Sequence, residues 1–454
     1  MKKYTYLLLL LSEVIFTTIF TSCLAEDRTL EYRERTDVNN WVYNEMLNAY
    51  LWYDGISEAD KLNFYATPGV FFKTLLSSKE NKNSSYYSTI DSIDNSSSNE
   101  SLSYGFDFVI DPTDSTSYAR VLYVLPDSPA SEAGLKRGDL IIAFNGLAIS
   151  KTNYTQMLTG NELKLMLGTF GGEKTDSITL SAARKVSDNP ILASNVLISN
   201  SGNTIGYLMY NHFSPGPNNN AYDYTYDNEL RQQFASFKSQ NVTDFVLDLR
   251  YNTGGYISCC QLLSTMLAPS SALGQTFCKI EYNDKYPEKT VYTFDSDSIK
   301  GGANLNLSHL YVLVSDYTAA TAELLINGLK PYMGITLIGT TTKGNNLVTR
   351  SIKNDTYNWV INPVVGKLYN SKDESEYSSG FTPDVKQDEF KDYSAFKELG
   401  DKNETLLKEA LALINGASLT KSTRTKSIST VLNTKQSSLD RKKTNGAWLA
   451  PINR

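Results

Sequence analysis

The stretch Leu310-Tyr-Val-Leu-Val-Ser-Asp-Tyr-Thr-Ala-Ala320-Thr-Ala-Glu323 continues as Leu324-Leu-Ile-Asn-Gly-Leu-Lys-Pro331 and then as Ile335-Thr-Leu-Ile-Gly339-Thr-Thr-Thr-Lys343-Gly-Asn345. Its first apolar run predicts a buried strand, and the apolar positions after Glu323 predict a helix. A second apolar run predicts another strand. Strands and helices that alternate in this way are typical of an α/β sheet covered on both faces.

These residues resemble the carboxyl-terminal processing (tail-specific) serine proteases. In that family, a buried strand leads into Ser/Thr-Ala-Ser-Ala-Ser-Glu, whose middle serine is the nucleophile. A later Gly-x-x-Thr-x-Gly-Lys supplies the lysine that acts as general base. When Glu323 and Gly339 set the common register, the nucleophile position is Ala320 and the base position is Asn345. We therefore expect Ala320 to begin a helix and to lie near Asn345.

Neither of these residues can perform the family's chemistry. A serine hydroxyl is a weak nucleophile and needs a base to take its proton. Ala320 has no hydroxyl, and the amide of Asn345 does not accept a proton near neutral pH. A single Ser-to-Ala change could be a laboratory substrate trap. Because Ala322 and the shifted Lys343 also depart from the motif, we favour natural loss of the site.

The segment Asp248-Leu-Arg-Tyr-Asn-Thr-Gly-Gly255 resembles the family's Asp-Leu-Arg-x-Asn-x-Gly-Gly. In the family, these glycines let backbone N–H groups approach the scissile carbonyl as an oxyanion hole. The resemblance assigns this role to the backbone of Gly254, Gly255 and Thr321. Ser379-Gly-Phe-Thr-Pro-Asp384 and the segment from Glu398 to Ile414 match the end of the family pattern.

Residues 104–185 resemble a PDZ domain. Ser128-Pro-Ala-Ser-Glu-Ala-Gly134-Leu-Lys-Arg-Gly138-Asp139 carries the resemblance, with proline at a helix start, glycine at its end and a strand following. Asn145-Gly146 predicts a hairpin turn. PDZ domains bind a peptide C-terminus by adding its strand to their sheet. The peptide-binding residues are then those of the loop and strand Tyr104, Gly105, Phe106, Asp107 and Phe108.

The N-terminus is expected to be a targeting segment. Lys2 and Lys3 precede an apolar run that is too short to span a bilayer comfortably. Phe20-Thr-Ser-Cys23 resembles a bacterial lipobox, so the resemblance implies acylation of Cys23 and a membrane contact through the lipid. Cell-envelope localisation as an outer-membrane lipoprotein, periplasmic or surface-exposed, follows. An ordinary cleaved signal peptide or a membrane anchor is the alternative.

Composition limits the other function classes. The net charge of −6 argues against nucleic-acid binding. With only His212 and His309 in the chain, no zinc-ligand spacing occurs, and we expect neither a metal nor a cofactor. Cys259 and Cys260 are adjacent and would form a strained bridge with each other. A bridge from one of them to Cys278 is an alternative.

The predicted fold is α/β with several domains: an N-terminal helical segment, a PDZ-like β-domain and an α/β core like that of the tail-specific proteases. We expect helices between residues 37 and 76, and disorder in the C-terminal tail, which is basic and has few apolar residues. The predicted divisions are a lipoprotein signal peptide (1–23), a helical segment (24–80), a linker (81–103), the PDZ-like domain (104–186), the core (187–416) and the tail (417–454).

Three functions fit these patterns. The first is a pseudo-protease of the cell envelope that binds peptides or protein C-terminal tails without cutting them. The second is an active serine-type endopeptidase with a relocated site at Thr318 or Thr321 and Lys343. A threonine one residue along a helix start points in a different direction, and Lys343 lies two residues before the base position. The third is a structural or glycan-associated envelope protein.

Overall fold

A computed structural model of the chain describes residues 32–82, 85–93, 102–112, 117–169, 172–217, 220–286, 290–391, 396–418, 437–441 and 446–449. The chain divides into two compact units, which are considered separately. The first contains residues 1–96, 283–286 and 351–365, and the second contains the remainder. Cys23 lies outside the described residues. Within the described ranges, no helix is long and apolar enough to cross a membrane.

The first unit combines helices with a small sheet. Its long helix spans residues 32–49, and α2 spans Pro68–Thr74, with proline at its first turn. Short 3₁₀ turns lie at η1 (Tyr53–Gly55), η2 (Ala59–Lys61) and η3 (Ser78–Glu80). The helices predicted between residues 37 and 76 are confirmed.

The segment predicted to be a linker, residues 81–103, contains three strands: β1 (Asn81–Lys82), β2 (Ser85–Tyr86) and β3 (Thr89–Ser92). β3 pairs antiparallel with β20 (Trp359–Asn362), which in turn pairs with β19 (Ile352–Asn354). The linker prediction was wrong for these residues. β1 and β2 pair with each other, and β3 is stabilised by pairing with a segment about 270 residues away and not by local apolar residues.

The PDZ-like part of the second unit is a six-stranded sheet in which five strands run in the order β4-β5-β6-β8-β9, with β4 at one edge. Its strands are β4 (Phe106–Pro112), β5 (Ser117–Val124), β6 (Leu140–Phe144), β8 (Leu163–Gly168) and β9 (Lys174–Leu180), and β7 (Leu147–Ala148) pairs with β6. The Ser128 side chain caps α4 (Pro129–Glu132), and Asn145 and Gly146 have the positive φ angles that a two-residue hairpin turn requires. Both local predictions are confirmed.

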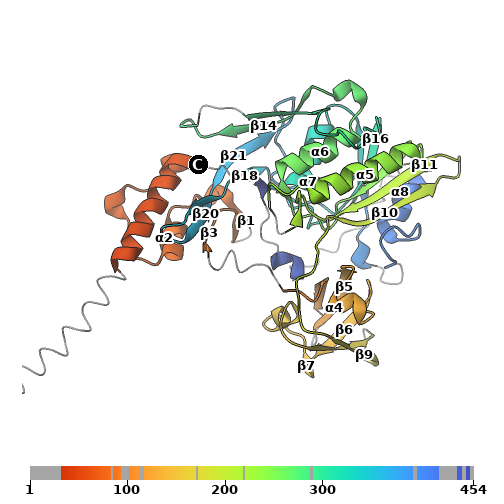
Figure 1. Cartoon of the computed structure of the whole chain (residues 1–454), viewed down its shortest axis with the longest axis horizontal. Coiled ribbons are helices and arrows are strands. Elements are labelled where there is room, and N and C mark those ends of the chain that lie inside the picture. The colour runs from red at the N-terminus through yellow and green to blue at the C-terminus, as the bar shows by residue number, and fades with distance from the viewer. Residues whose placement is uncertain are drawn as a thin grey trace, which may run out of the picture. The chain divides into compact units, whose positions relative to one another are not determined.

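The core sheet runs β10-β11-β12-β16-β17-β22, parallel except for β10. Its strands are β10 (Ile191–Ile198), β11 (Thr204–Tyr210), β12 (Asp244–Asp248), β16 (His309–Val314), β17 (Gly334–Gly339) and β22 (Val385–Lys386). The helices between these strands in the chain are α5 (Thr225–Ser239), α6 (Ile257–Leu267) and α7 (Thr321–Leu329), and Figure 1 shows them as neighbours. A further helix, α8 (Thr405–Ile414), follows β22.

Helices cover both faces of this sheet. Side chains alternate between faces along a strand, so Phe245 and Val246 of β12 point in opposite directions. Phe245 stacks on Phe234 of α5, whereas Val246 packs in a cluster with Leu406 and Leu407 of α8. The predicted α/β layer arrangement is confirmed.

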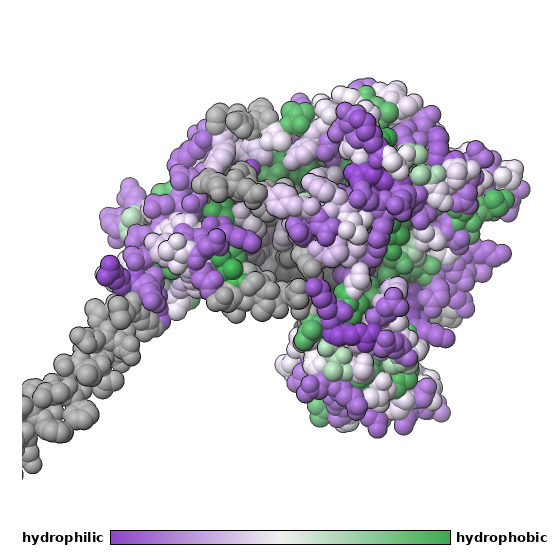
Figure 2. Space-filling view, in the orientation of Figure 1, coloured by the Kyte–Doolittle hydropathy of each residue, from purple (hydrophilic) through white to green (hydrophobic). Residues whose placement is uncertain are grey.

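One face of the molecule is mostly hydrophilic, interrupted by smaller apolar patches (Figure 2).

A second six-stranded sheet lies beside the core helices and has the order β13-β23-β18-β21-β14-β15. Its strands are β13 (Gly255–Tyr256), β14 (Thr276–Tyr282), β15 (Thr290–Thr293), β18 (Leu347–Thr349), β21 (Val364–Tyr369) and β23 (Ala447–Trp448). The tail predicted to be disordered therefore contributes a strand, and also a 3₁₀ turn, η9 (Ser438–Arg441). The prediction of disorder failed for these residues because strand pairing and a few buried apolar side chains, among them Leu439 and Ala447, hold them against distant parts of the chain.

Candidate functional site

Ala320 occupies a strained turn at the start of α7. It is the N-cap residue of the helix, with φ 54° and ψ −112°, and it is completely buried. A residue with a Cβ adopts this conformation only where the surrounding structure imposes it, and such strain is characteristic of functional sites. A sharp strand-to-helix turn of this kind is also how hydrolases present a nucleophile. Ala320 therefore has the backbone geometry of such a turn, and its side chain carries no oxygen.

Replacing Ala320 with glycine should test this strain. Glycine adopts positive φ without a steric penalty, so we expect Ala320→Gly to raise the free energy of unfolding by about 1 kcal/mol. The matched control is Ala322→Gly, two residues later inside α7, which should lower it by about 1 kcal/mol. Chemical denaturation of both variants measures the difference. An equal loss of stability in both would show that Ala320 is not strained.

Glu323 joins the nucleophile position to the base position. Its carboxylate accepts hydrogen bonds from the N–H of Ala320 at 3.1 Å and from the N–H of Asn345 at 2.7 Å, both at Oε2. Oε1 accepts from the hydroxyl of Thr342 and the N–H of Gly344. One buried carboxylate thus connects the two segments, which places Ala320 and Asn345 on either side of it.

The environment of Glu323 acts on its ionisation in two opposing ways. Complete burial raises the pKa of Glu323 to about 7, although its four hydrogen bonds lower it. Since all four partners donate to the carboxylate, the ionised form is the one that the geometry satisfies.

The Asn345 side chain, 1% exposed, accepts a hydrogen bond from the N–H of Leu347 at 3.0 Å. It makes a local turn contact of the kind that a lysine ammonium, which only donates, cannot make.

Of the two glycines predicted to form an oxyanion hole, Gly254 lies directly beside Ala320. A Cβ built on Gly254 would be 3.0 Å from the Cβ of Ala320 and 3.5 Å from Oγ1 of Thr321. The N–H of Gly254 is engaged by the Asn252 side chain at 3.0 Å. The N–H of Gly255 donates instead to the carbonyl oxygen of Gly446 at 3.2 Å. Of the two, Gly255 is the one whose amide faces a peptide carbonyl.

The alternative catalytic residues are less suitably placed. The Thr318 hydroxyl donates to the Leu249 carbonyl at 2.8 Å and is part of the turn itself. Oγ1 of Thr321 is buried and has no hydrogen-bond partner among the residues that the structure describes. No base lies within hydrogen-bond distance of it there. Lys343 is exposed, whereas a lysine that serves as a base must be desolvated.

The residues predicted to bind a peptide carboxylate, Tyr104 to Phe108, are all buried. The N–H of Gly105 donates to Oγ of Ser103 at 2.9 Å, and Ser128 packs so closely that any Cβ on Gly105 would lie 2.2 Å from its Cβ. The Gly105 amide, in the loop expected to bind a peptide carboxylate, is therefore already engaged by Ser103. The N–H of Phe108 donates to Oγ of Ser438, which is distant in the sequence, at 2.8 Å.

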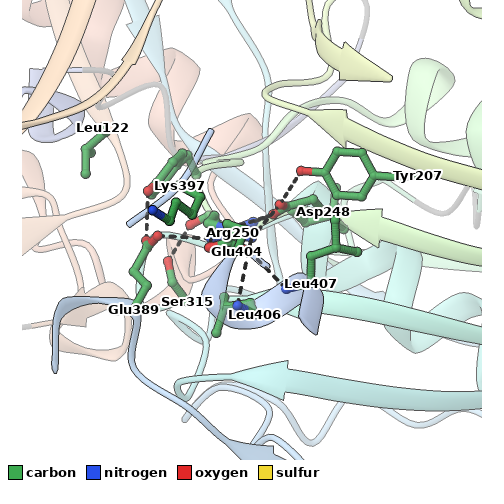
Figure 3. Close-up of polar contacts among 12 residues, drawn as sticks. Leu122, Tyr207, Asp248, Arg250, Ser315, Glu389, Lys397, Glu404, Leu406 and Leu407 are labelled. Atoms are coloured by element: carbon green, nitrogen blue, oxygen red, sulfur yellow. Dashed lines mark hydrogen bonds and ion pairs between the residues drawn. The ribbon is translucent and has the colours of Figure 1, made fainter. Parts of the chain in front are cut away.

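A buried charge network underlies the site (Figure 3). The guanidinium of Arg250 contacts Asp248, Glu404 and Glu389, at 2.8, 2.5 and 3.0 Å respectively. Arg137, from the PDZ-like part, contacts Glu389 at 2.8 Å. The backbone carbonyl of Arg250 accepts a hydrogen bond from Ser315, which precedes the Ala320 turn. The network thus connects the PDZ-like sheet to the segment that positions Ala320.

Sequence reasoning included Arg137, Asp248, Arg250 and Glu404 only as parts of motifs and missed Glu389. Burial raises the pKa of Glu404, but Arg250 and Arg137 outweigh it and hold that pKa at about 2. Burial likewise lowers the pKa of Arg250, and its three carboxylate neighbours more than reverse this. Such partners are recognisable only in three dimensions, since an isolated Arg or Glu in a sequence is usually at the surface.

Among the cysteines, Cys260 contacts the site, because its Sγ donates to the carbonyl of Thr321 at 3.2 Å. Cys259, Cys260 and Cys278 are free buried thiols, so the alternative of a bridge to Cys278 is not supported. His212 contacts Asp188, and His309 contacts Thr336. Throughout the described ranges, no group of three or more His, Cys, Asp or Glu residues could hold a metal ion.

Comparison with known proteins agrees with this architecture. Models for the N-terminal domain of peptidase S41, a PDZ domain and peptidase family S41 match residues 37–89, 120–166 and 204–387. A solved S41-type structure from Bacteroides fragilis NCTC 9343 is 36% identical with a TM-score of 0.74, covering 83% of this chain and 97% of that one. This chain belongs to peptidase family S41.

Two further relatives are less similar in sequence. The carboxy-terminal processing protease CtpA of Bacillus subtilis (strain 168) is 27% identical over 282 residues, which are 60% of this chain and 54% of that protein. The chain thus spans about half the length of the curated relatives it matches. The photosystem II D1 C-terminal processing protease shares the fold, with 18% identity and a TM-score of 0.51 over 83% of this chain and 98% of that one.

Proposed function

We propose that this S41 family member is a peptide-binding pseudo-protease, which holds extended peptides or protein C-terminal tails at the family's active-site position without cutting them. One observation carries the proposal: the strained Ala320 turn, the Gly255 amide and the Glu323 link to Asn345 are all assembled, yet the nucleophile and the base are absent. A PDZ domain in a family of C-terminal processing proteases also suggests binding of protein C-termini.

Activity of the unmodified protein tests this proposal. We expect purified wild-type protein to leave an unstructured protein such as casein intact and to show no labelling by a fluorophosphonate, because Ala320 offers no oxygen to attack. Gel electrophoresis and fluorescence of the labelled protein measure the two outcomes. Turnover that Thr321→Ala or Lys343→Ala abolishes would instead establish a relocated active site.

The same proposal includes attachment to a membrane through an acylated Cys23, in the cell envelope. It is supported by Thr21-Ser22-Cys23 after an apolar run. We expect a fatty-acid label fed to producing cells to enter the wild-type protein and not the Cys23→Ala variant. Equal labelling of the two, or labelling of neither, would remove this part of the proposal.

A further inference from the structure

Two stretches near the C-terminus occupy the places where a bound peptide would pair. These stretches, residues 437–441 and 446–449, are here called the C-terminal segment. Both belong to the second compact unit, together with the PDZ-like sheet and the core. The first stretch lies against edge strand β4, and the second lies beside Gly254 and Gly255.

The first stretch uses the free edge of the PDZ-like sheet. Ser437 pairs antiparallel with Val109 of β4, and its hydroxyl donates to the Phe108 carbonyl at 2.8 Å. Oγ of Ser438 accepts the Phe108 N–H at 2.8 Å and donates to Asp107 at 2.6 Å. The Leu439 side chain is buried in the cluster that contains Val109. This is strand addition at a sheet edge, the mode by which PDZ domains bind peptides.

The second stretch fills a slot that is one strand wide. β23 pairs in parallel with β13 on one side, where Ala447 lies opposite Gly255. It pairs in parallel with β18 on the other side, where Ala447 lies opposite Val348. Neighbouring strands in a sheet are about 4.8 Å apart, so β13 and β18 leave room between them for one extended chain. The strand on one side, β13, begins at Gly255, and the strand on the other side, β18, begins two residues after Asn345.

The carbonyl of Gly446 takes the place of a scissile carbonyl. The Gly446 carbonyl oxygen accepts the N–H of Gly255 at 3.2 Å. A Cβ built on Gly254 would lie 2.9 Å from this oxygen and 3.0 Å from the Cβ of Ala320, so the oxygen and Ala320 both adjoin Gly254. A Cβ on Gly446 itself would lie 2.7 Å from Oγ1 of Thr349. Only a residue without a side chain therefore fits at this point of the slot.

We propose that the C-terminal segment is a tethered ligand of this chain's own peptide site: it presents the Gly446–Ala447 bond to the position of the lost nucleophile, and an external peptide binds only by displacing it. The inference rests on the proposed peptide-binding function. It specifies the ligand as an extended chain whose glycine lies beside Ala320 and is followed by alanine. A tethered ligand acts at an effective concentration of roughly millimolar, so it competes strongly with free peptides.

The first test examines the segment within the full chain. Hydrogen–deuterium exchange should show slow exchange at the Leu449 amide, which donates to the Thr349 carbonyl. Gly446→Val should release residues 446–449 and speed exchange there at least tenfold, because the new side chain meets Thr349. The matched control is Gly55→Val, since nothing lies within 4 Å of a Cβ at Gly55. Fast exchange at Leu449 in the wild-type protein would overturn the inference and leave the proposed function intact.

The second test measures competition. A fluorescent synthetic peptide with the sequence of residues 437–449 should bind the Gly446→Val protein at least tenfold more tightly than the wild-type or Gly55→Val protein. A chain that ends at Gln436, shown by circular dichroism to be folded, should bind it at least as tightly as Gly446→Val. Equal affinity in all four proteins would overturn the inference. If the Leu449 amide exchanges slowly in the wild-type protein but none of the proteins binds the peptide, the proposed function is overturned. The contact between the C-terminal segment and the slot is then still established.

Discussion

The double change Ala320→Ser with Asn345→Lys is expected to make the protein cut its own chain between Gly446 and Ala447. The Gly446 carbonyl already accepts the Gly255 N–H, so the new serine would face a carbon positioned for attack. The new lysine would lie at a site where Asn345 is 1% exposed, and burial lowers the pKa of a lysine and lets it act as a base. The serine oxygen would bond to the Gly446 carbon, the lysine would pass the proton to the Ala447 nitrogen, and water would release Gly446.

Intact mass spectrometry should detect loss of the fragment from Ala447 to Arg454, and a fluorophosphonate should label the double variant before it cuts. Each single change is the control. Because serine without a base and a base without serine each leave the unit broken, the single variants should react on the order of 10⁴-fold more slowly. A folded double variant that neither cuts nor becomes labelled would argue against Ala320 and Asn345 as the paired positions.

Arg250→Ala is expected to destabilise the protein by about 3–5 kcal/mol. Arg250 is completely buried and compensates the charges of Asp248, Glu404 and Glu389. Removing one partner of a buried ion pair leaves charges that neither water nor a cation neutralises. Urea denaturation at pH 7 measures the loss. Arg184→Ala is the matched control: its ion pair with Glu132 is exposed, and exposed pairs contribute about 0–1 kcal/mol.

The loss should also depend on pH in a defined direction. Glu404 has a pKa of about 2 in the folded protein, below its ordinary value of 4.5, so its contribution to stability is complete above pH 4.5 and is lost as the pH falls toward 2. Without Arg250, Glu404 can bind a proton at a higher pH, and the difference between wild type and variant should shrink on acidification. A difference that stays constant from pH 7 to pH 4 would show that Arg250 does not act through these carboxylates.

Much of the core could be predicted because its signals are local. The apolar runs that begin at Leu310 and Ile335 correspond to β16 (His309–Val314) and β17 (Gly334–Gly339), and the helix expected after Glu323 is α7 (Thr321–Leu329). Ser128-Pro129 and Asn145-Gly146 determine a cap and a turn through their own φ angles and hydrogen bonds. Such features require no knowledge of the rest of the chain.

The sequence by itself therefore determined the α/β and PDZ-like architecture, and its register with the family motif singled out Ala320 and Asn345. Only the tertiary structure placed Arg137 against Glu389, 252 positions later, and Ser437 against Val109. Burial of a charge depends on what the fold brings next to it, so it leaves no local pattern. Strand addition uses the backbone N–H and C=O groups, and every residue except proline has both. For this reason, composition could not reveal that part of a polar tail fills the peptide site.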